Sequence, residues 1–236
     1  MAGKLQGISI YLIYSCLLIC FSGVSLFSQT NISGIINKYA SVSSIVADLV
    51  IINDEAQFDQ FSARDTVLLI QMKGARIYAS EATTYGTAYA SYGKPGKHEF
   101  LTILSVDDAT NTIVFRNNIL NSTFDLECGV QIIKVPSYNA AVVDAVLTCQ
   151  PWDSVTKTGG VLTAIIGRTL SLNADIDVSG KGFKGGDITA GKGICATTNV
   201  SKLDKYVFAA GTDSSGFKGE GLAIRANAGA IPYPSI

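Results

Sequence analysis

Apolar and polar residues alternate most clearly at residues 170–183, where the sequence reads LSLNADIDVSGKGF. The apolar positions are Leu170, Leu172, Ala174, Ile176 and Val178, with one polar residue between each pair. A period of two predicts a strand that buries all five apolar side chains on one face. Glycines follow at positions 180, 182, 185 and 186, and they predict a turn that ends the strand.

Six shorter runs rich in Val, Ile, Leu and Phe precede this strand. They cover residues 47–53, 66–72, 99–106, 112–116, 130–135 and 141–148. Each run predicts a strand, and the sequence DDATN at 107–111 predicts a hairpin between two of them. A short helix is expected within 55–64. We therefore predict a polar lead-in at 29–45 and a small antiparallel β-domain, sandwich-like or barrel-like, at 46–150.

The composition changes after Pro151, because 14 of the 23 glycines lie beyond residue 158. Residues 161–166 predict a further strand, which Gly167 and Arg168 turn into the strand at Leu170. Two strands joined by a tight corner fit either successive rungs of a parallel β-solenoid or a plain hairpin. We predict that residues 151–236 form a Gly-rich β-sheet or the start of a β-solenoid, truncated at its C-terminal end. The chain as a whole is predicted to be all-β.

The N-terminus has the features of a signal peptide at 1–28. Lys4 precedes the apolar run Ile8–Phe27, and Ser28 is a small residue before the polar sequence QTNIS. An uncleaved membrane anchor is the alternative, because the apolar run is long enough to span a bilayer. Cleavage predicts a secreted or cell-surface protein with no membrane contact beyond the signal peptide.

Charge is low and balanced. Asp, Glu, Lys and Arg make up 16% of the residues, and the net charge is −1. Soluble proteins have about 25% charged residues on average. This balance gives no electrostatic reason to expect nucleic acid or an anionic membrane as a partner.

Three cysteines remain once Cys16 and Cys20 leave with the signal peptide, namely Cys128, Cys149 and Cys195. An exported chain could pair Cys128 with Cys149, and the alternative is three small buried residues. The sequence has no CxxC motif and His98 is its single histidine, so we expect no zinc site.

No catalytic constellation is visible, and we predict neither catalytic residues nor a cofactor. His98 has no second histidine or GxSxG motif to build a triad with, and we expect it on the surface at the start of a strand. Asp175 and Asp177 share the polar face of the Leu170 strand. They are candidate Ca²⁺ ligands, a candidate acidic pair for glycoside hydrolysis, or a solvated face. Tyr85 and Tyr89, in a tyrosine-rich segment, are candidates for binding a sugar or a partner protein, or they pack on the β-domain.

Several longer segments resemble one family. They are VLLIQMKGARI (67–77), VQIIKVPSYNAAVV (130–143), LTCQPWD (147–153), TGGVLTAIIGRTLSLNADIDVSGKGFKGG (158–186) and FKGEGLA (217–223). Together they resemble the N-terminal region of large adhesin-like surface proteins of gliding bacteria, which are exported by the type IX secretion system. The resemblance covers most of residues 35–225 and implies no catalytic residues.

The sequence thus predicts a non-enzymatic module of a secreted or cell-surface adhesin-like protein. Its expected partners are surface glycans or other cell-surface proteins, together with the secretion machinery. Two alternatives remain open. One is a fragment of a β-helical carbohydrate-active enzyme that uses Asp175 and Asp177, and the other is a carbohydrate-binding module that uses Tyr85 and Tyr89.

Overall fold

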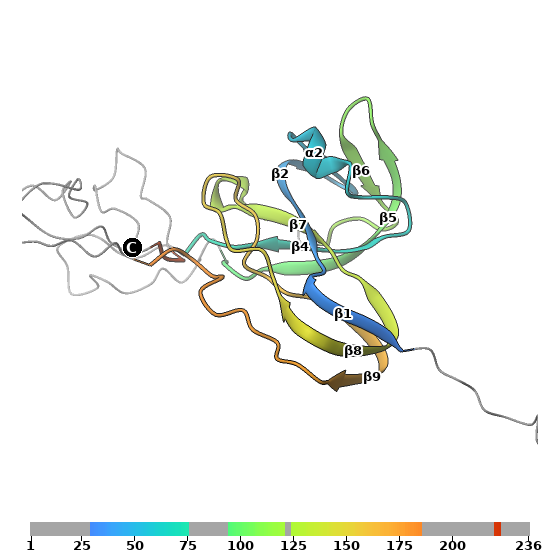
Figure 1. Ribbon diagram of the computed structural model, residues 1–236. Coiled ribbons are helices and arrows are strands. Elements are labelled where there is room, and N and C mark those ends of the chain that lie inside the picture. Colours follow the sequence, from blue (N-terminus) through green and yellow to red (C-terminus); the bar gives the residue numbers. More distant parts are fainter. Residues whose placement is uncertain (1–28, 76–93, 121–123, 186–219, 223–236) are drawn as a thin grey trace, which may run out of the picture.

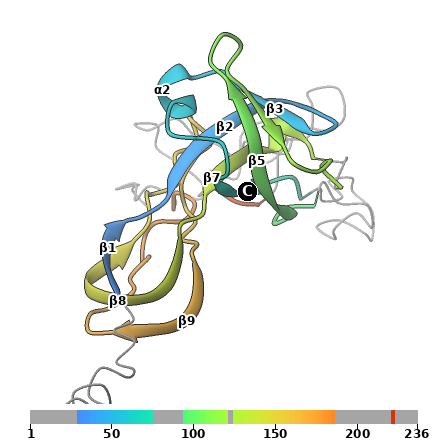
Figure 2. The same cartoon turned by 90° about the vertical axis from the view of Figure 1, so that its right-hand side faces the viewer.

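The computed structural model describes residues 29–75, 94–120, 124–185 and 220–222. A closed antiparallel barrel and a three-stranded parallel sheet lie side by side (Figures 1 and 2). The all-β prediction is therefore confirmed. The predicted signal peptide at 1–28 lies outside the described residues. In the described part, no helix has the length and apolar character needed to cross a membrane.

Six strands form the barrel. They are β2 (Lys38–Val46), β3 (Leu49–Ile52), β4 (Thr66–Gln71), β5 (His98–Asp107), β6 (Thr112–Phe115) and β7 (Val130–Lys134). They follow one another round the barrel in the order β2-β3-β6-β5-β4-β7, and β7 pairs with β2 to close it. All neighbours are antiparallel, which confirms the predicted small β-domain in its barrel form. The predicted hairpin at 107–111 is also confirmed, and it joins β5 to β6.

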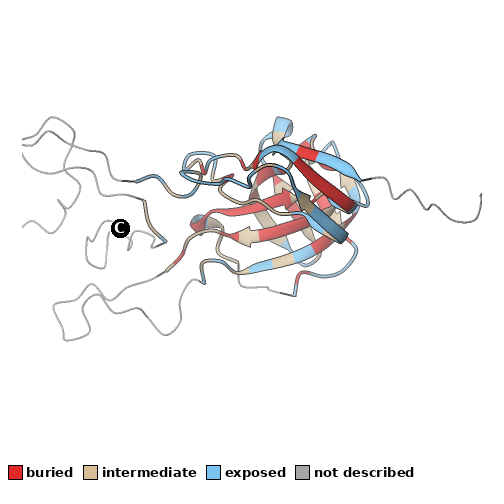
Figure 3. Cartoon of the chain, turned by 60° about the horizontal axis from the view of Figure 1, so that its bottom comes forward, coloured by how far each residue is buried: buried red, intermediate tan, exposed pale blue. Residues whose placement is uncertain are grey.

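Buried aliphatic and aromatic residues of the barrel strands form one core cluster, as in other small closed barrels. Figure 3 shows buried residues in red along these strands. Phe58 and Phe61 join this core from the segment between β3 and β4. Phe58 ends the short helix α2 (Glu55–Phe58). The helix expected within 55–64 is therefore a single turn, because the chain turns after Phe58 and brings Phe61 into the core as well.

The second sheet contains β1 (Thr30–Ile35), β8 (Ser137–Thr148) and β9 (Ile165–Leu172). Its order is β1-β8-β9, and both pairings are parallel. The prediction of a lead-in without strands at 29–45 is wrong, because this segment contains β1 and most of β2. β1 gave no alternating signal because it is an edge strand, and Ile32 is its single buried residue.

The predicted boundary at residue 150 falls inside this sheet, between β8 and β9. β8 was expected in the antiparallel domain, but it is the central strand of the parallel sheet. The strand expected at 161–166 begins only at Ile165. Gly167 and Arg168 do not form the predicted corner, because they lie within β9 at an irregularity in its pairing with β8.

The apolar positions expected to be buried along 170–178 are largely exposed, and β9 covers only the first of them, up to Leu172. The exposed fractions are 39% for Leu170, 60% for Leu172, 43% for Ile176 and 45% for Val178. One reason is that β9 is the outer strand of the sheet, the one farthest from the barrel (Figures 1 and 2). A second reason is that the regular strand ends at Leu172, where Asn173 and Ala174 both donate their backbone N–H to the carbonyl oxygen of Val143, so Ile176 and Val178 lie beyond it.

An extended segment at residues 159–163, which we call the bridging segment, joins the barrel to the sheet. Three buried side chains from in and beside the barrel bind every second residue of it. Gln131 exchanges two hydrogen bonds of 2.9 Å with the backbone of Gly159, Tyr39 donates to the Val161 carbonyl at 2.7 Å, and Asn37 donates to the Thr163 carbonyl at 2.7 Å and accepts from its N–H at 3.0 Å. These polar groups are buried and paired, which is the condition for their stability in a core.

Apolar contacts follow the same alternation. Val161 packs on the outer surface of the barrel, against a cluster that includes Tyr39 and Ile133. The next residue, Leu162, packs against the core of the parallel sheet, which includes Val143. The bridging segment is therefore shared between the two hydrophobic clusters.

We predict that Gln131→Leu lowers the free energy of unfolding by about 2–3 kcal/mol, because it leaves the buried N–H and C=O of Gly159 without partners. Chemical denaturation measures the change. The matched control is Gln60→Leu, whose half-buried amide makes a single hydrogen bond to Ala56. A loss no larger than that of the control would contradict the role assigned to Gln131.

Candidate functional site

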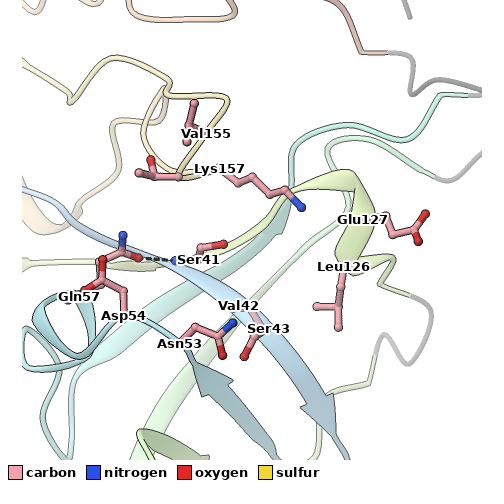
Figure 4. Close-up of a pocket in the computed structure, with 11 residues that line it drawn as sticks. Ser41, Val42, Ser43, Asn53, Asp54, Gln57, Leu126, Glu127, Val155 and Lys157 are labelled. Carbon is pink, nitrogen blue, oxygen red and sulfur yellow. Dashed lines mark hydrogen bonds between the residues drawn. The ribbon is translucent and has the colours of Figure 1, made fainter.

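An open hollow of about 500 Å³ lies on the side of the barrel (Figure 4). It lies where β2 changes its partner. Ser41 makes the last pair with β7, opposite Gln131, and Val42 makes the first pair with β3, opposite Ile52. The register of the new pairing shifts before Ser44. The barrel wall therefore opens between β2 and the residues that precede β7.

The hollow has three sides. One is formed by β2 together with the residues that lead into α2, the second by the 3₁₀ turn η1 (Leu126–Cys128), and the third by the turn at 153–158. The lining residues are Ser41, Val42, Ser43, Asn53, Asp54, Gln57, Leu126, Glu127, Val155, Thr156 and Lys157. Seven of the eleven side chains carry hydroxyl, carboxamide or carboxylate groups, and Lys157 supplies an ammonium group.

Hydrogen bonds within the protein fix one wall of the hollow. The side-chain oxygen of Gln57 accepts from the backbone N–H of Ser41 at 2.8 Å (Figure 4). Asp54 is the N-cap of α2 and accepts from the backbone N–H of Gln57 at 3.2 Å. The hydroxyl of Ser43 donates to the Ile51 carbonyl at 2.9 Å. These contacts hold the wall in one arrangement without a ligand.

The turn at 153–158 is also fixed by its own side chains. The carboxylate of Asp153 accepts from the backbone N–H groups of Val155 at 2.8 Å and Thr156 at 3.4 Å. These hydrogen bonds, the one from Val155 first, lower the pKa of Asp153. Lys157 has a φ of 58°, in the left-handed region that few residues other than glycine adopt. Its side chain extends from the turn toward the side of the hollow formed by Leu126 and Glu127 (Figure 4).

The hollow has the groups needed for noncovalent binding of a polar molecule. Its serines are candidate nucleophiles only by residue type, because His98 is not among the lining residues. His98 is exposed at the start of β5, as predicted, and its Nδ1 lies 2.9 Å from the Gly96 carbonyl oxygen.

A second polar cluster forms where residues 220–222 meet the barrel. The carboxylate of Glu220 forms an ion pair with Lys73 and accepts hydrogen bonds from Trp152 Nε1 at 3.0 Å and the Lys184 backbone N–H at 3.3 Å. The rings of Trp152 and Phe183 meet edge to face, with centroids 5.4 Å apart. Burial alone would raise the pKa of Glu220, but the hydrogen bonds from Lys73, Trp152 and Lys184 outweigh it and lower the pKa. We interpret this cluster of Glu220, Lys73, Trp152 and Lys184 as a structural clasp, which binds residues 220–222 to the barrel side of the molecule.

The structure does not bring the predicted acidic pair into a site. Asp175 and Asp177 are both exposed and lie beyond the end of β9. The carboxylate of Asp177 accepts from the Ser179 backbone N–H at 2.8 Å, and its hydrogen bonds with Ser179 lower its pKa. Within the described ranges, no three His, Cys, Asp or Glu side chains are grouped so that they could hold a metal ion. Among the described residues, no third carboxylate therefore joins Asp175 and Asp177 to form a cation site.

Of the two alternatives for Cys128 and Cys149, a disulfide or small buried residues, the structure has the second. Cys149 is a buried free thiol just after β8, and its burial raises its pKa. Cys128 is buried elsewhere, in η1, where its carbonyl accepts from the Lys73 backbone N–H. The other predicted residues, Tyr85, Tyr89 and Cys195, lie outside the described residues.

The residues of the hollow were missed by sequence reasoning. Ser41 and Ser43 lie in the predicted lead-in, and no pattern in the sequence singles out Glu127 or Lys157. One available signal was the pair Asn53-Asp54 before the helix, since Asp is a favoured N-cap. That signal places the start of α2 but gives no indication of the opposite wall.

Comparisons with protein-family models, with curated proteins and with solved structures give no match to this chain. The functional argument therefore rests on the geometry and on the sequence features described above.

We predict that Glu220→Gln is less stable than the wild type at neutral pH by about 1–2 kcal/mol, because a charged acceptor is lost. The lowered pKa of Glu220 means that its stabilisation is present above the ordinary value of 4.5 and is lost as pH falls through the folded-state pKa. Thermal unfolding between pH 7 and pH 3 should therefore show the two proteins converging in acid.

The control for this comparison is Glu55→Gln, which removes an exposed carboxylate and should change the unfolding free energy by less than about 0.5 kcal/mol at neutral pH. A difference between wild type and Glu220→Gln that stays constant down to pH 3 would contradict the clasp.

Proposed function

We propose that this chain is a non-enzymatic module of an exported, adhesin-like surface protein, in which the sheet β1-β8-β9 is the start of a parallel β-solenoid. The observation that carries the solenoid is an aliphatic column, Ile32–Val143–Leu172, that runs across the three strands. The exported, adhesin-like character is supported by the predicted signal peptide, the low charge and the family resemblance of the sequence.

The column follows from the register of the strands. Ile32 of β1 pairs with Val143 of β8, and Val143 pairs with Leu172 of β9. Leu147 of β8 also pairs with Ile176, which lies beyond the end of β9, and with Gly34 of β1. Paired residues of parallel strands point to the same face of a sheet. The aliphatic side chains of β9 thus continue the apolar face formed by β1 and β8.

Exposure changes sharply along this column. The exposed fraction is 5% for Ile32 and 0% for Val143, but it is 60% for Leu172. A β-solenoid buries each rung by stacking the next one on it. The open end of the column at β9 is the surface that a further rung would cover.

The spacing of paired residues also suits a solenoid. Partners on β8 and β9 are 28 residues apart at Ser137 and Ile165, and 29 residues apart at Leu147 and Ile176. Solenoid repeats are about 20–45 residues long. Terminal repeats of such proteins need a cap, and we propose that the barrel with β1 is the cap at the N-terminal end. The partners of the assembled protein would be surface glycans or other cell-surface proteins, after passage through the secretion machinery.

We predict that Leu172→Asp in the whole protein lowers the free energy of unfolding by about 2 kcal/mol, because a carboxylate would be buried beneath the next rung. Val155→Asp is the matched control, since Val155 is 87% exposed on a turn. Denaturation of the two variants should differ clearly. Equal, small effects would mean that solvent covers the β9 face, and the solenoid would be wrong.

The cellular part of the proposal has its own test. Protease added to intact cells should degrade the protein, as it does other surface-exposed chains, while a cytoplasmic marker stays intact. Protection of the protein in intact cells, or turnover of polysaccharide or peptide substrates by the purified chain, would contradict the proposed role.

A further inference from the structure

The hollow at the β2 opening has the size of a small-molecule site. Its volume of about 500 Å³ lies within the range of about 300–1,000 Å³ that is common for such sites. Its walls come from parts of the chain that are far apart in sequence but are each held by their own hydrogen bonds. A site fixed in this way loses little conformational freedom when a ligand binds.

The lining offers donors and acceptors together. The carboxamide of Asn53 can do both, the hydroxyl of Ser41 can do both, Glu127 accepts and Lys157 donates. Sugar hydroxyl groups also donate and accept, so a saccharide can use all four. Leu126 and Val155 add apolar surface, which suits the C–H face of a sugar ring.

Charge narrows the class of ligand. The carboxylates of Asp54 and Glu127 oppose an anion such as a phosphate, a sulfate or a uronic acid. The ammonium group of Lys157 opposes a cation at the same place. Among the described residues that line the hollow, none is an aromatic residue on which a nucleobase could stack. A neutral polyhydroxyl compound is repelled neither by the carboxylates nor by the ammonium group, and it needs no aromatic stacking partner.

We propose that this hollow binds a neutral saccharide of one or two sugar units. The inference rests on the proposed surface location only for the source of the sugar. The binding itself is a property of the barrel and does not depend on the solenoid.

The test is a titration of the whole purified chain, followed by NMR of its backbone amides. The neutral probes are lactose and cellobiose, the acidic probe is 3′-sialyllactose, and the cationic probe is the peptide Lys-Gly-Lys. We expect a neutral sugar, at up to about 20 mM, to shift the amide signals of Ser41, Asn53 and Lys157 selectively. Sialyllactose should bind more weakly than lactose, because it differs from lactose by a carboxylate-bearing sugar.

Variants separate binding from folding. Asn53→Ala should weaken binding about fivefold or more, as expected for the loss of one or two hydrogen bonds. Asn118→Ala is the matched control, because Asn118 is exposed and outside the lining, and it should leave binding unchanged. Each variant is checked for a wild-type amide spectrum before titration.

Four results would overturn the inference. They are the absence of shifts at the hollow with both neutral sugars, tighter binding of sialyllactose than of lactose, binding of the peptide alone, and equal effects of the two Asn variants. None of these results bears on Leu172→Asp, so failure of the saccharide site and failure of the solenoid are distinguishable.

Discussion

The bridging segment at 159–163 is the element on which the arrangement of the two sheets depends. The side chains of Gln131, Tyr39 and Asn37 form hydrogen bonds with its backbone at Gly159, Val161 and Thr163. In a sheet, the backbone of a neighbouring strand would form such bonds. Gly159 is required there, because its φ is +93° and a Cβ would lie 2.2 Å from the Pro151 carbonyl oxygen. β9 begins two residues after this segment, so the place of the outermost strand is set by buried amide and phenol groups.

The strands of the barrel could be predicted because each is a local run of β-branched and aliphatic residues. The hairpin at 107–111 was predictable for the same reason, since its turn residues lie between two such runs. Closure of the barrel and the parallel pairing of β1 with β8 could not be predicted, because they join residues 90 to 96 and 111 to 113 positions apart, respectively. Gln131 lies in the run at 130–135 that predicts a strand. Nothing in the neighbouring sequence indicates that its side chain is fully buried.

The sequence predicted correctly which side chains of the segment around β9 share one face, but not whether that face is buried. Leu172 and Ile176 do lie on the face of the sheet that carries Val143 and Leu147. Burial was predicted from alternation alone, but it also requires a neighbour, and β9 is the outer strand of the described sheet. The hollow could not be predicted at all, because its chemistry arises from three ordinary polar segments that only the folded barrel brings together.

The parallel direction of β1, β8 and β9 has a mechanical consequence. Tension applied between Thr30, at the N-terminal end of β1, and Leu172, at the C-terminal end of β9, acts along the strands. Such a force shears the sheet, so that the interstrand hydrogen bonds resist it together rather than breaking one after another as in a peeled hairpin. The geometry suits a tether that must stay folded while it is pulled.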